Sequence, residues 1–125
     1  MATVRYLSGE AVRQLPGAPE DTKDVFAAVL DDCQAWIGYY PLDAPGEVGV
    51  IIWFPPSFLR HGTREEVGAL LLYPRMMRAK LVCYPHNGHP GAVKALKRAG
   101  FVERKDGGLE LANPWKFNWP LVTRP

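Results

Sequence analysis

Long apolar runs, export signals and cysteines are all scarce in this sequence. It contains no stretch of 18 consecutive apolar residues, the length that suggests a membrane-spanning helix. Its first residues, MATVRYLSGEAVRQ, lack the basic-then-apolar order of a secretory signal peptide. Cys33 and Cys83 are the only cysteines, and without a sign of secretion we expect free thiols rather than a disulfide. The sequence therefore predicts no membrane association and no secretion by a signal of its own.

Basic residues are scarce in the first half of the chain, although the formal net charge is only +2. Residues 1–59 carry three basic and eight acidic side chains, a balance of −5, and residues 60–125 carry twelve basic and five acidic ones, a balance of +7. Three interpretations stay open: the charges intermix on folding, an anionic ligand binds the second half, or acidic and basic surfaces of two subunits meet. Nucleic acid is not expected as a partner, because no recognised binding motif is present.

The length and the overall composition fit one compact domain over residues 1–125. This length can bury a core without disulfides or metals. A content of 47% hydrophobic and 22% charged residues is ordinary for a globular protein. No internal repeat or low-complexity tract divides the chain.

In the first half of the chain, the sequence predicts a strand, a helix and a hairpin. Residues 3–6 suit a short strand, and Pro19 with the acids after it suits the start of a helix of about three turns. The apolar positions of that helix are Thr22, Val25, Phe26, Val29 and Leu30. The β-rich residues 35–40 and the continuous apolar run 48–54 then predict a hairpin with a central second strand.

The second half alternates helices with strands. Thr63-Arg-Glu-Glu66 has the pattern of a helix-capping box, and residues 79–84 form another β-type run. A helix is predicted over 90–99 with Gly100 as its stop, followed by a hairpin within 101–117. This order predicts an α/β or α+β fold, a mixed sheet flanked by helices in a single three-layer domain.

Several segments follow one another in an order typical of one protein family. VGVIIWF is a strand, Arg60-His61-Gly62-Thr63 a loop, AKLVCY a further strand, and AVKALKRAGF a helix with a Gly-Phe exit. The arrangement resembles the GCN5-related N-acetyltransferase family, in which an Arg/Gln-x-x-Gly-x-Gly/Ala loop lies between the first strand and a helix. The resemblance covers about residues 35–112 and leaves 113–125 as a C-terminal tail.

The resemblance implies a coenzyme A site, with acetyl-CoA as the cofactor of an active member. In the family, amides of the loop bind the pyrophosphate at a helix N-terminus. The implied cofactor-binding residues are Arg60, His61, Gly62, Thr63 and Asn87.

Four departures from the family pattern predict a weakened site. The loop has one glycine where the motif has two small residues, and Glu65 and Glu66 place negative charge beside it. Leu96 stands where active members often carry a tyrosine acid, and Asn87 lies two residues early, with His89 in its expected position.

Trp53, His89 and Leu96 loosely match a narrower group, the small acetyltransferase-like proteins of T7-like podophages. Those proteins share a leucine in the tyrosine position, a histidine before the helix and a tryptophan in the central strand. Some of them are virion components. This resemblance implies a location in the virion or the host cytoplasm, and it implies other subunits, virion components or further copies of the chain as partners.

Three residues are candidates for catalysis if the chain is an enzyme. Glu47 lies just before the central strand, where it is placed to act as a general base, and Tyr84 or His89 would replace the missing acid. Each is equally suited to a structural role. Other residues considered as the acid are Tyr39, Tyr40 and His86. Cys83, His86 and His89 are spaced by three, but no fourth ligand or second shell is evident, so we expect no metal.

The C-terminal aromatics Trp115, Phe117 and Trp119 admit two interpretations. They pack the domain's own core, or they form an exposed apolar patch that docks on a partner. The sequence thus favours a phage-type virion or assembly protein built on an acetyltransferase-like fold with a degenerate acyl-CoA site. The alternative is an acetyl-CoA-dependent N-acetyltransferase acting on a primary amine.

Overall fold

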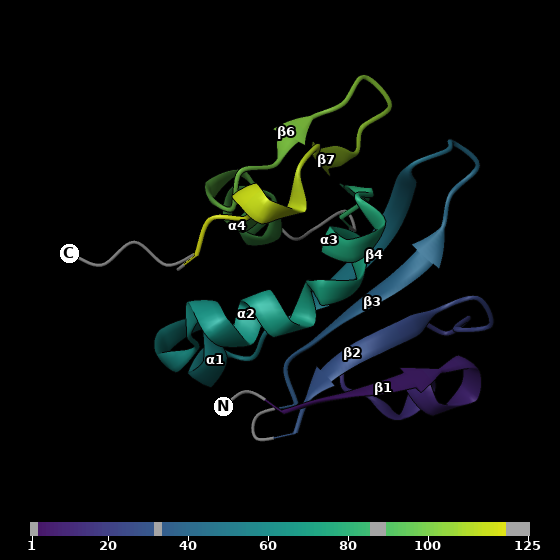
Figure 1. The fold of residues 1–125 in the computed structure, drawn as a ribbon, viewed down its shortest axis with the longest axis vertical. Coiled ribbons are helices and arrows are strands. Elements are labelled where there is room, and N and C mark those ends of the chain that lie inside the picture. The colour runs from purple at the N-terminus through teal and green to yellow at the C-terminus, as the bar shows by residue number, and fades with distance from the viewer. Residues whose placement is uncertain (1–2, 32–33, 86–89, 120–125) are drawn as a thin grey trace.

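The computed structural model describes residues 3–31, 34–85 and 90–119. They form a seven-stranded mixed sheet of order β1-β2-β3-β4-β5-β7-β6 (Figure 1). Neighbouring strands are antiparallel except β4 and β5, which are parallel. The strands are β1 (Val4–Ser8), β2 (Phe26–Leu30), β3 (Trp36–Pro41), β4 (Glu47–Trp53), β5 (Lys80–Cys83), β6 (Val102–Glu103) and β7 (Leu109–Leu111).

Helices in the described residues connect the strands and cover the sheet. They are the α-helices α1 (Pro56–His61), α2 (Arg64–Leu70), α3 (Leu72–Met77) and α4 (Pro90–Arg98), and the 3-10 helices η1 (Gly9–Gln14) and η2 (Pro114–Lys116). Helices α1 to α3 join β4 to β5, since two parallel strands need a long crossover. The predicted α+β fold with one mixed sheet is confirmed.

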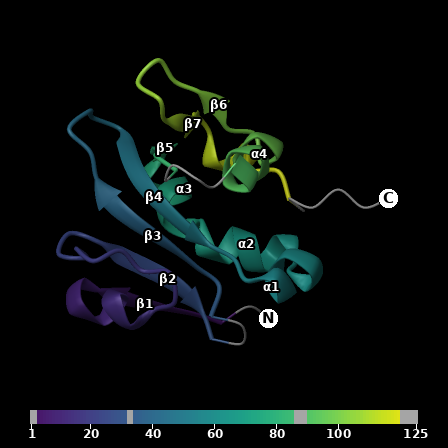
Figure 2. The ribbon, with the colours of Figure 1, turned by 180° about the vertical axis from the view of Figure 1, so that it is seen from behind.

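The two faces of the sheet are covered by unequal layers. On one face β2, β3 and β4 pack against side chains of the α-helices, and the buried members include Ile37, Val50, Phe58, Leu70 and Leu96. On the other face the cover is η1 and the segment after it, and the buried members are Val12, Leu15, Val25, Ala27, Val29 and Trp36. Figures 1 and 2 show α1 to α3 along one side of β3 and β4.

The helix predicted after Pro19 is wrong, because Phe26–Leu30 form strand β2 between β1 and β3. Ala28 and Leu30 enter the core under the helices, whereas Ala27 and Val29 enter the core under η1. A strand buried on both faces shows an apolar run that periodicity alone cannot distinguish from a helix. Burial on two faces, a tertiary property, decided the outcome.

The crossover from β4 to β5 contains more helix than the sequence predicted. The capping box of α2 is confirmed, with Thr63 as the N-cap and Glu66 as its partner. Helix α1 was not predicted; it begins at Pro56, whose missing N–H costs nothing in a first helical turn. Helix α3 ends at Arg78, which has φ of 54°.

The remaining predicted elements are confirmed with small shifts in their ends. The strands at 3–6, 35–40, 48–54 and 79–84 are β1, β3, β4 and β5. Helix α4 is followed by Gly100 at φ of 109°, a conformation that favours glycine, and β6 and β7 form the final hairpin. No helix in the described part of the chain is both long and apolar enough to cross a membrane.

Candidate functional site

The candidate functional site lies where β4 and β5 separate. The two strands pair only from Glu47 with Lys80 to Gly49 with Val82. Strand β4 continues as far as Trp53, still paired with β3. Among the described residues, therefore, no strand pairs with the last four residues of β4 on the β5 side.

Alternation along the antiparallel strands shows where the backbone groups of β4 point. The Leu30 amide donates to the Ala35 carbonyl (2.9 Å), so Ala35 faces β2 and the next residue, Trp36, faces β4. Trp36 lies opposite Trp53. Trp53, Ile51 and Gly49 therefore direct their N–H and C=O groups toward β3, and the residues between them direct theirs to the opposite side.

Val50 and Ile52 consequently direct their N–H and C=O groups toward β5. The pairing of β4 with β5 gives the same result. The Lys80 amide donates to the Gly46 carbonyl (2.7 Å), so Gly46 faces β5, and Val50, an even number of residues further along the strand, faces the same side. The pairing of Gly49 with Val82 uses the Val50 amide, so the groups that lie beyond the pairing are the Val50 carbonyl and the amide and carbonyl of Ile52. Backbone groups of this kind can bind an extended ligand or polarise a carbonyl group.

The predicted cofactor loop is largely helical. Arg60 and His61 form the last turn of α1, and Gly62 follows as its C-cap. A Cβ at Gly62 would lie 2.6 Å from the Phe58 carbonyl oxygen, so close packing explains the glycine. The Gly62 amide donates to that carbonyl (2.7 Å), and its own carbonyl accepts from Trp119 Nε1 (3.0 Å).

The start of α2 is occupied by a carboxylate of the chain itself. Glu66 Oε1 accepts hydrogen bonds from the Thr63 amide (3.0 Å) and the Thr63 hydroxyl (3.1 Å). In return, Thr63 Oγ1 accepts from the Glu66 amide (3.1 Å). Two amides that a phosphate would use are thus already bonded, and a negative charge stands beside them.

Two of the predicted catalytic residues, Glu47 and Tyr84, belong to one cluster of charged side chains. Glu47 Oε2 lies 3.3 Å from Arg104 Nη1 and 3.6 Å from Lys80 Nζ. Arg104 Nε lies 3.3 Å from Asp106 Oδ2, which accepts from the Tyr84 hydroxyl (2.9 Å). We call this group the charged cluster; its members are Glu47, Lys80, Tyr84, Arg104, Asp106 and Glu110, the last at 3.2 Å from Lys80 and 3.3 Å from Arg104.

The contacts in the charged cluster oppose proton transfer by its members. The hydrogen bond to Asp106 raises the pKa of Tyr84, since ionised tyrosine could no longer donate it. The Gly108 amide and then the Tyr84 hydroxyl lower the pKa of Asp106. The bond to Glu47 raises the pKa of Arg104, and Glu47 itself lies between two cations. The arrangement suits a fixed ion-pair network.

The other two tyrosines considered as acids, Tyr39 and Tyr40, are held by burial and packing. The buried Tyr39 hydroxyl donates to the Leu70 carbonyl (2.6 Å), and burial raises its pKa far above the usual range. Tyr40 lies against Gly49, where a Cβ would be 2.2 Å from its ring, and burial raises its pKa as well. Leu96, in the tyrosine position of the family, is buried in the core under the helices.

Of the three residues whose spacing was weighed for a metal, and for which no metal is expected, His86 and His89 lie outside the described residues. The predicted cofactor-binding residue Asn87 lies outside them as well. Cys83 is free and buried, and burial raises the pKa of its thiol to about 11. Within the described ranges, no group of three His, Cys, Asp or Glu residues is suited to hold a metal ion.

The three C-terminal aromatics separate into two kinds. Phe117 and Trp119 are buried, and Trp119 packs against Phe54 and Phe58. Trp115 is exposed over 66% of its surface and carries the Arg75 guanidinium 4.6 Å from its ring centroid. The expectation of a docking aromatic therefore rests on Trp115.

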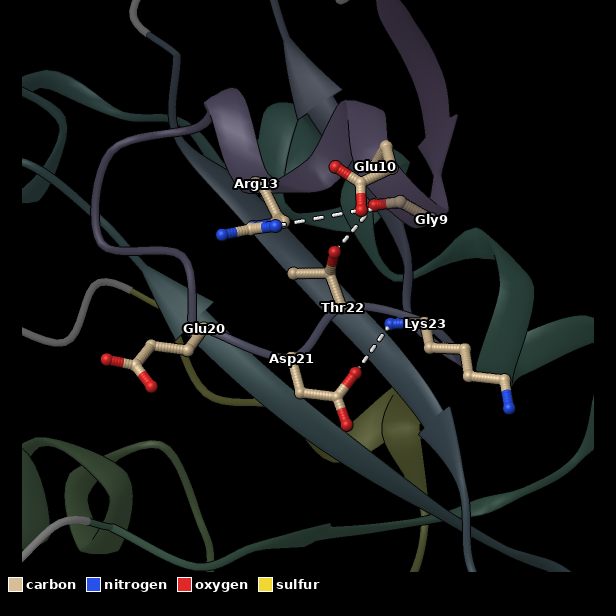
Figure 3. A pocket seen from close by; sticks show the side chains of 7 residues that line it. All are labelled: Gly9, Glu10, Arg13, Glu20, Asp21, Thr22 and Lys23. Atoms are coloured by element: carbon tan, nitrogen blue, oxygen red, sulfur yellow. Dashed lines mark hydrogen bonds and ion pairs between the residues drawn. The ribbon is translucent and has the colours of Figure 1, made fainter.

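An acidic depression lies between η1 and the loop before β2 (Figure 3). Its lining residues are Gly9, Glu10, Arg13, Glu20, Asp21, Thr22 and Lys23. The Thr22 hydroxyl donates to the Gly9 carbonyl (2.7 Å), and the Lys23 amide donates to Asp21 Oδ1 (3.0 Å). Three carboxylates and two cations give this wall an acidic balance.

Sequence interpretation missed the partners of Glu47 and the exposed side of α3. The Glu47 partners Lys80 and Arg104 are 33 and 57 residues away along the chain, and only the order of strands brings them together. The exposed Met76 and Met77 in a short helix were a usable signal, because exposed methionines are frequent at binding surfaces.

No known protein family matches the chain, and searches of curated proteins and of solved structures give no match either.

Proposed function

We propose that this chain is an interaction protein of the phage-virion or phage-assembly type, built on an acetyltransferase-like fold whose acyl-CoA site does not operate. The observation that carries the proposal is the capping box at the start of α2. Glu66 occupies the Thr63 amide that the family's pyrophosphate would approach. An additional phosphate would meet a carboxylate at short range and would need to break these bonds.

Two further features support the proposal. The position of the family's tyrosine acid is Leu96, which is buried and carries no proton to donate. The described catalytic candidates Glu47 and Tyr84 are bound to Arg104 and Asp106, respectively. The exposed Trp115 and the methionines near it, by contrast, are typical of protein interfaces.

A second candidate function is acetyl transfer from acetyl-CoA to a primary amine. It is favoured by the separation of β4 from β5, which leaves the amide and carbonyl of Ile52 directed away from β3 with no described strand paired on that side. An amide at this position could polarise a thioester carbonyl while a deprotonated amine attacks the acyl carbon and the coenzyme A thiolate leaves.

Calorimetry with acetyl-CoA at millimolar concentration, followed by a transfer assay on a panel of amines, separates the two functions. The proposal expects no heat of binding and no release of free coenzyme A thiol. In cells that produce the phage particles, it also expects the chain to sediment with assembled particles. Saturable binding together with amine-dependent thiol release would establish the second function instead.

A further inference from the structure

Helix α3 and η2, which the contact of Arg75 with Trp115 joins, expose four large apolar side chains. Their exposed fractions are 46% for Leu72, 73% for Met76, 63% for Met77 and 66% for Trp115. Arg75 of α3 lies over the Trp115 ring of η2, at 4.6 Å from its centroid, and this contact joins the two elements. We call Leu72, Arg75, Met76, Met77 and Trp115 the α3–η2 surface.

The tryptophan on this surface is held in place before any partner arrives. The Asn113 side chain caps η2 by accepting from the Trp115 amide (3.0 Å). Arg75 covers one side of the ring and directs Nη1 at the Gly68 carbonyl (3.4 Å). An anchor with few rotamers to lose binds at low entropic cost, and tryptophan, methionine and arginine are enriched in interfaces.

The charges on α3, its C-cap residue and η2 have one sign. Arg75, Arg78 and Lys116 are basic, and neither α3 nor η2 contains an acidic residue. Two copies of this surface facing each other would bring these cations together, which disfavours a symmetric contact of the surface with itself. The partner surface should combine apolar groups with carboxylates.

The chain itself carries such a segment at residues 16–24, PGAPEDTKD. Its first part offers the partly exposed apolar residues Pro16, Ala18 and Pro19, and its second part offers the exposed acids Glu20, Asp21 and Asp24. Glu20 and Asp21 also line the acidic depression (Figure 3). With three acids and one cation, Lys23, the segment carries a net charge opposite to that of the α3–η2 surface, and it also offers apolar groups.

The segment and the α3–η2 surface belong to opposite faces of the sheet. Ala18 packs with the core under η1, whereas Tyr73 of α3 packs with the core under the α-helices. One chain therefore cannot cover its own surface with its own segment. Two different surfaces on opposite sides allow chains to associate head to tail.

We propose that the α3–η2 surface binds residues 16–24 of a second copy of this chain, in a heterologous contact. This inference rests on the proposed interaction function and names the partner. Trp115 and Met76 pack on the proline-containing part, and Arg78 and Lys116 face Glu20, Asp21 and Asp24. Successive contacts of this type close into a ring or extend as a filament, depending on the rotation between copies.

Sedimentation velocity of the full chain, from micromolar to millimolar concentration, tests the contact. The wild type should gain mass above one chain as concentration rises. A surface variant, Met76→Glu with Lys116→Glu, and a segment variant, Glu20→Gln with Asp24→Asn, should each associate at least tenfold more weakly, a loss of about 1.4 kcal/mol. Asp43→Lys and Lys105→Glu, at exposed positions outside both surfaces, are the matched controls and should associate as the wild type does.

An equimolar mixture of the two variants gives the decisive result. Each variant keeps one intact surface, so the mixture should form a species of two chains and nothing larger. A wild type that stays monomeric at millimolar concentration would overturn the inference, as would a mixture that forms no two-chain species. Binding of a monomeric wild type to phosphatidylserine vesicles, lost in Met76→Glu, would assign the surface to a membrane and also overturn it.

Failure of this test is distinguishable from failure of the proposed function. Acetyl-CoA binding is measured separately, and circular dichroism melts check that each variant folds. A monomer that binds no acetyl-CoA would contradict the self-contact alone.

Discussion

The two ends of β4 differ in what is left available for chemistry. At its start, Glu47 is 14% exposed and lies between Arg104 (3.3 Å) and Lys80 (3.6 Å). At its end, the Val50 carbonyl and the amide and carbonyl of Ile52 point toward a side where no described strand pairs with them. The comparison teaches that the carboxylate at the start of β4 is held in ion pairs, whereas part of the backbone at its end has no described strand beside it.

Trp119, in the C-terminal tail, packs on the residues that follow β4. The largest loss of unfolding free energy is therefore expected from Trp119→Ala. Trp119 packs against Phe54 and Phe58, and Nε1 donates to the Gly62 carbonyl. Removal of this buried ring should lower the free energy of unfolding by about 3–5 kcal/mol, measured by urea denaturation. Trp115→Ala, at an exposed position, is the matched control and should cost well under half as much. Equal losses would mean that Trp119 is not part of the core.

The start of α2 is tested by Thr63→Ala, with a smaller effect. The change removes the hydroxyl that caps the Glu66 amide, and it should lower the free energy of unfolding by about 1 kcal/mol. Thr63→Ser keeps the oxygen and should retain most of the stability. If alanine and serine destabilise equally, the capping box does not contribute as described.

At the start of β4, Glu47→Gln should have a modest effect. Loss of the carboxylate weakens its pairs with Lys80 and Arg104, and about 0.5–1 kcal/mol of unfolding free energy should be lost. The loss should shrink in high salt, because the pairs are partly exposed. Asp43→Asn at an exposed position is the control. A loss that persists unchanged in high salt would argue against an electrostatic origin.

The smallest effect is expected from pH, through Asp106 and Tyr84. The pKa of Asp106 is lowered in the folded chain, so its contribution is present above the unfolded pKa and is lost as pH falls through the folded pKa. Asp106→Asn should therefore flatten the acid side of the stability curve. The pKa of Tyr84 is raised, so its contribution is lost as pH rises past about 10. Tyr84→Phe should flatten the alkaline side, and it should flatten the acid side in part, because the Tyr84 hydroxyl helps to lower the pKa of Asp106. Urea melts across pH measure both slopes, and an alkaline slope that is unchanged in Tyr84→Phe would contradict the account.

Local signals in the sequence predicted local structure well. The Thr63–Glu66 capping box and Gly100 are specified within a few residues, and both are where the sequence placed them. The identity of β2 required knowing that Val29 and Leu30 are buried on opposite faces, which depends on η1 and α2. The same reason hid the contact between Glu47 and Arg104, which the chain order of the strands creates.

The most direct test of the central claim follows the Thr63 and Glu66 amides by NMR during a titration with acetyl-CoA. These are the groups that the capping box occupies at the start of α2, within the crossover from β4 to β5. If Glu66 closes this site, neither amide resonance should move at millimolar acetyl-CoA. Saturable shifts of both amides would show that the cofactor displaces the carboxylate, and they would contradict the account.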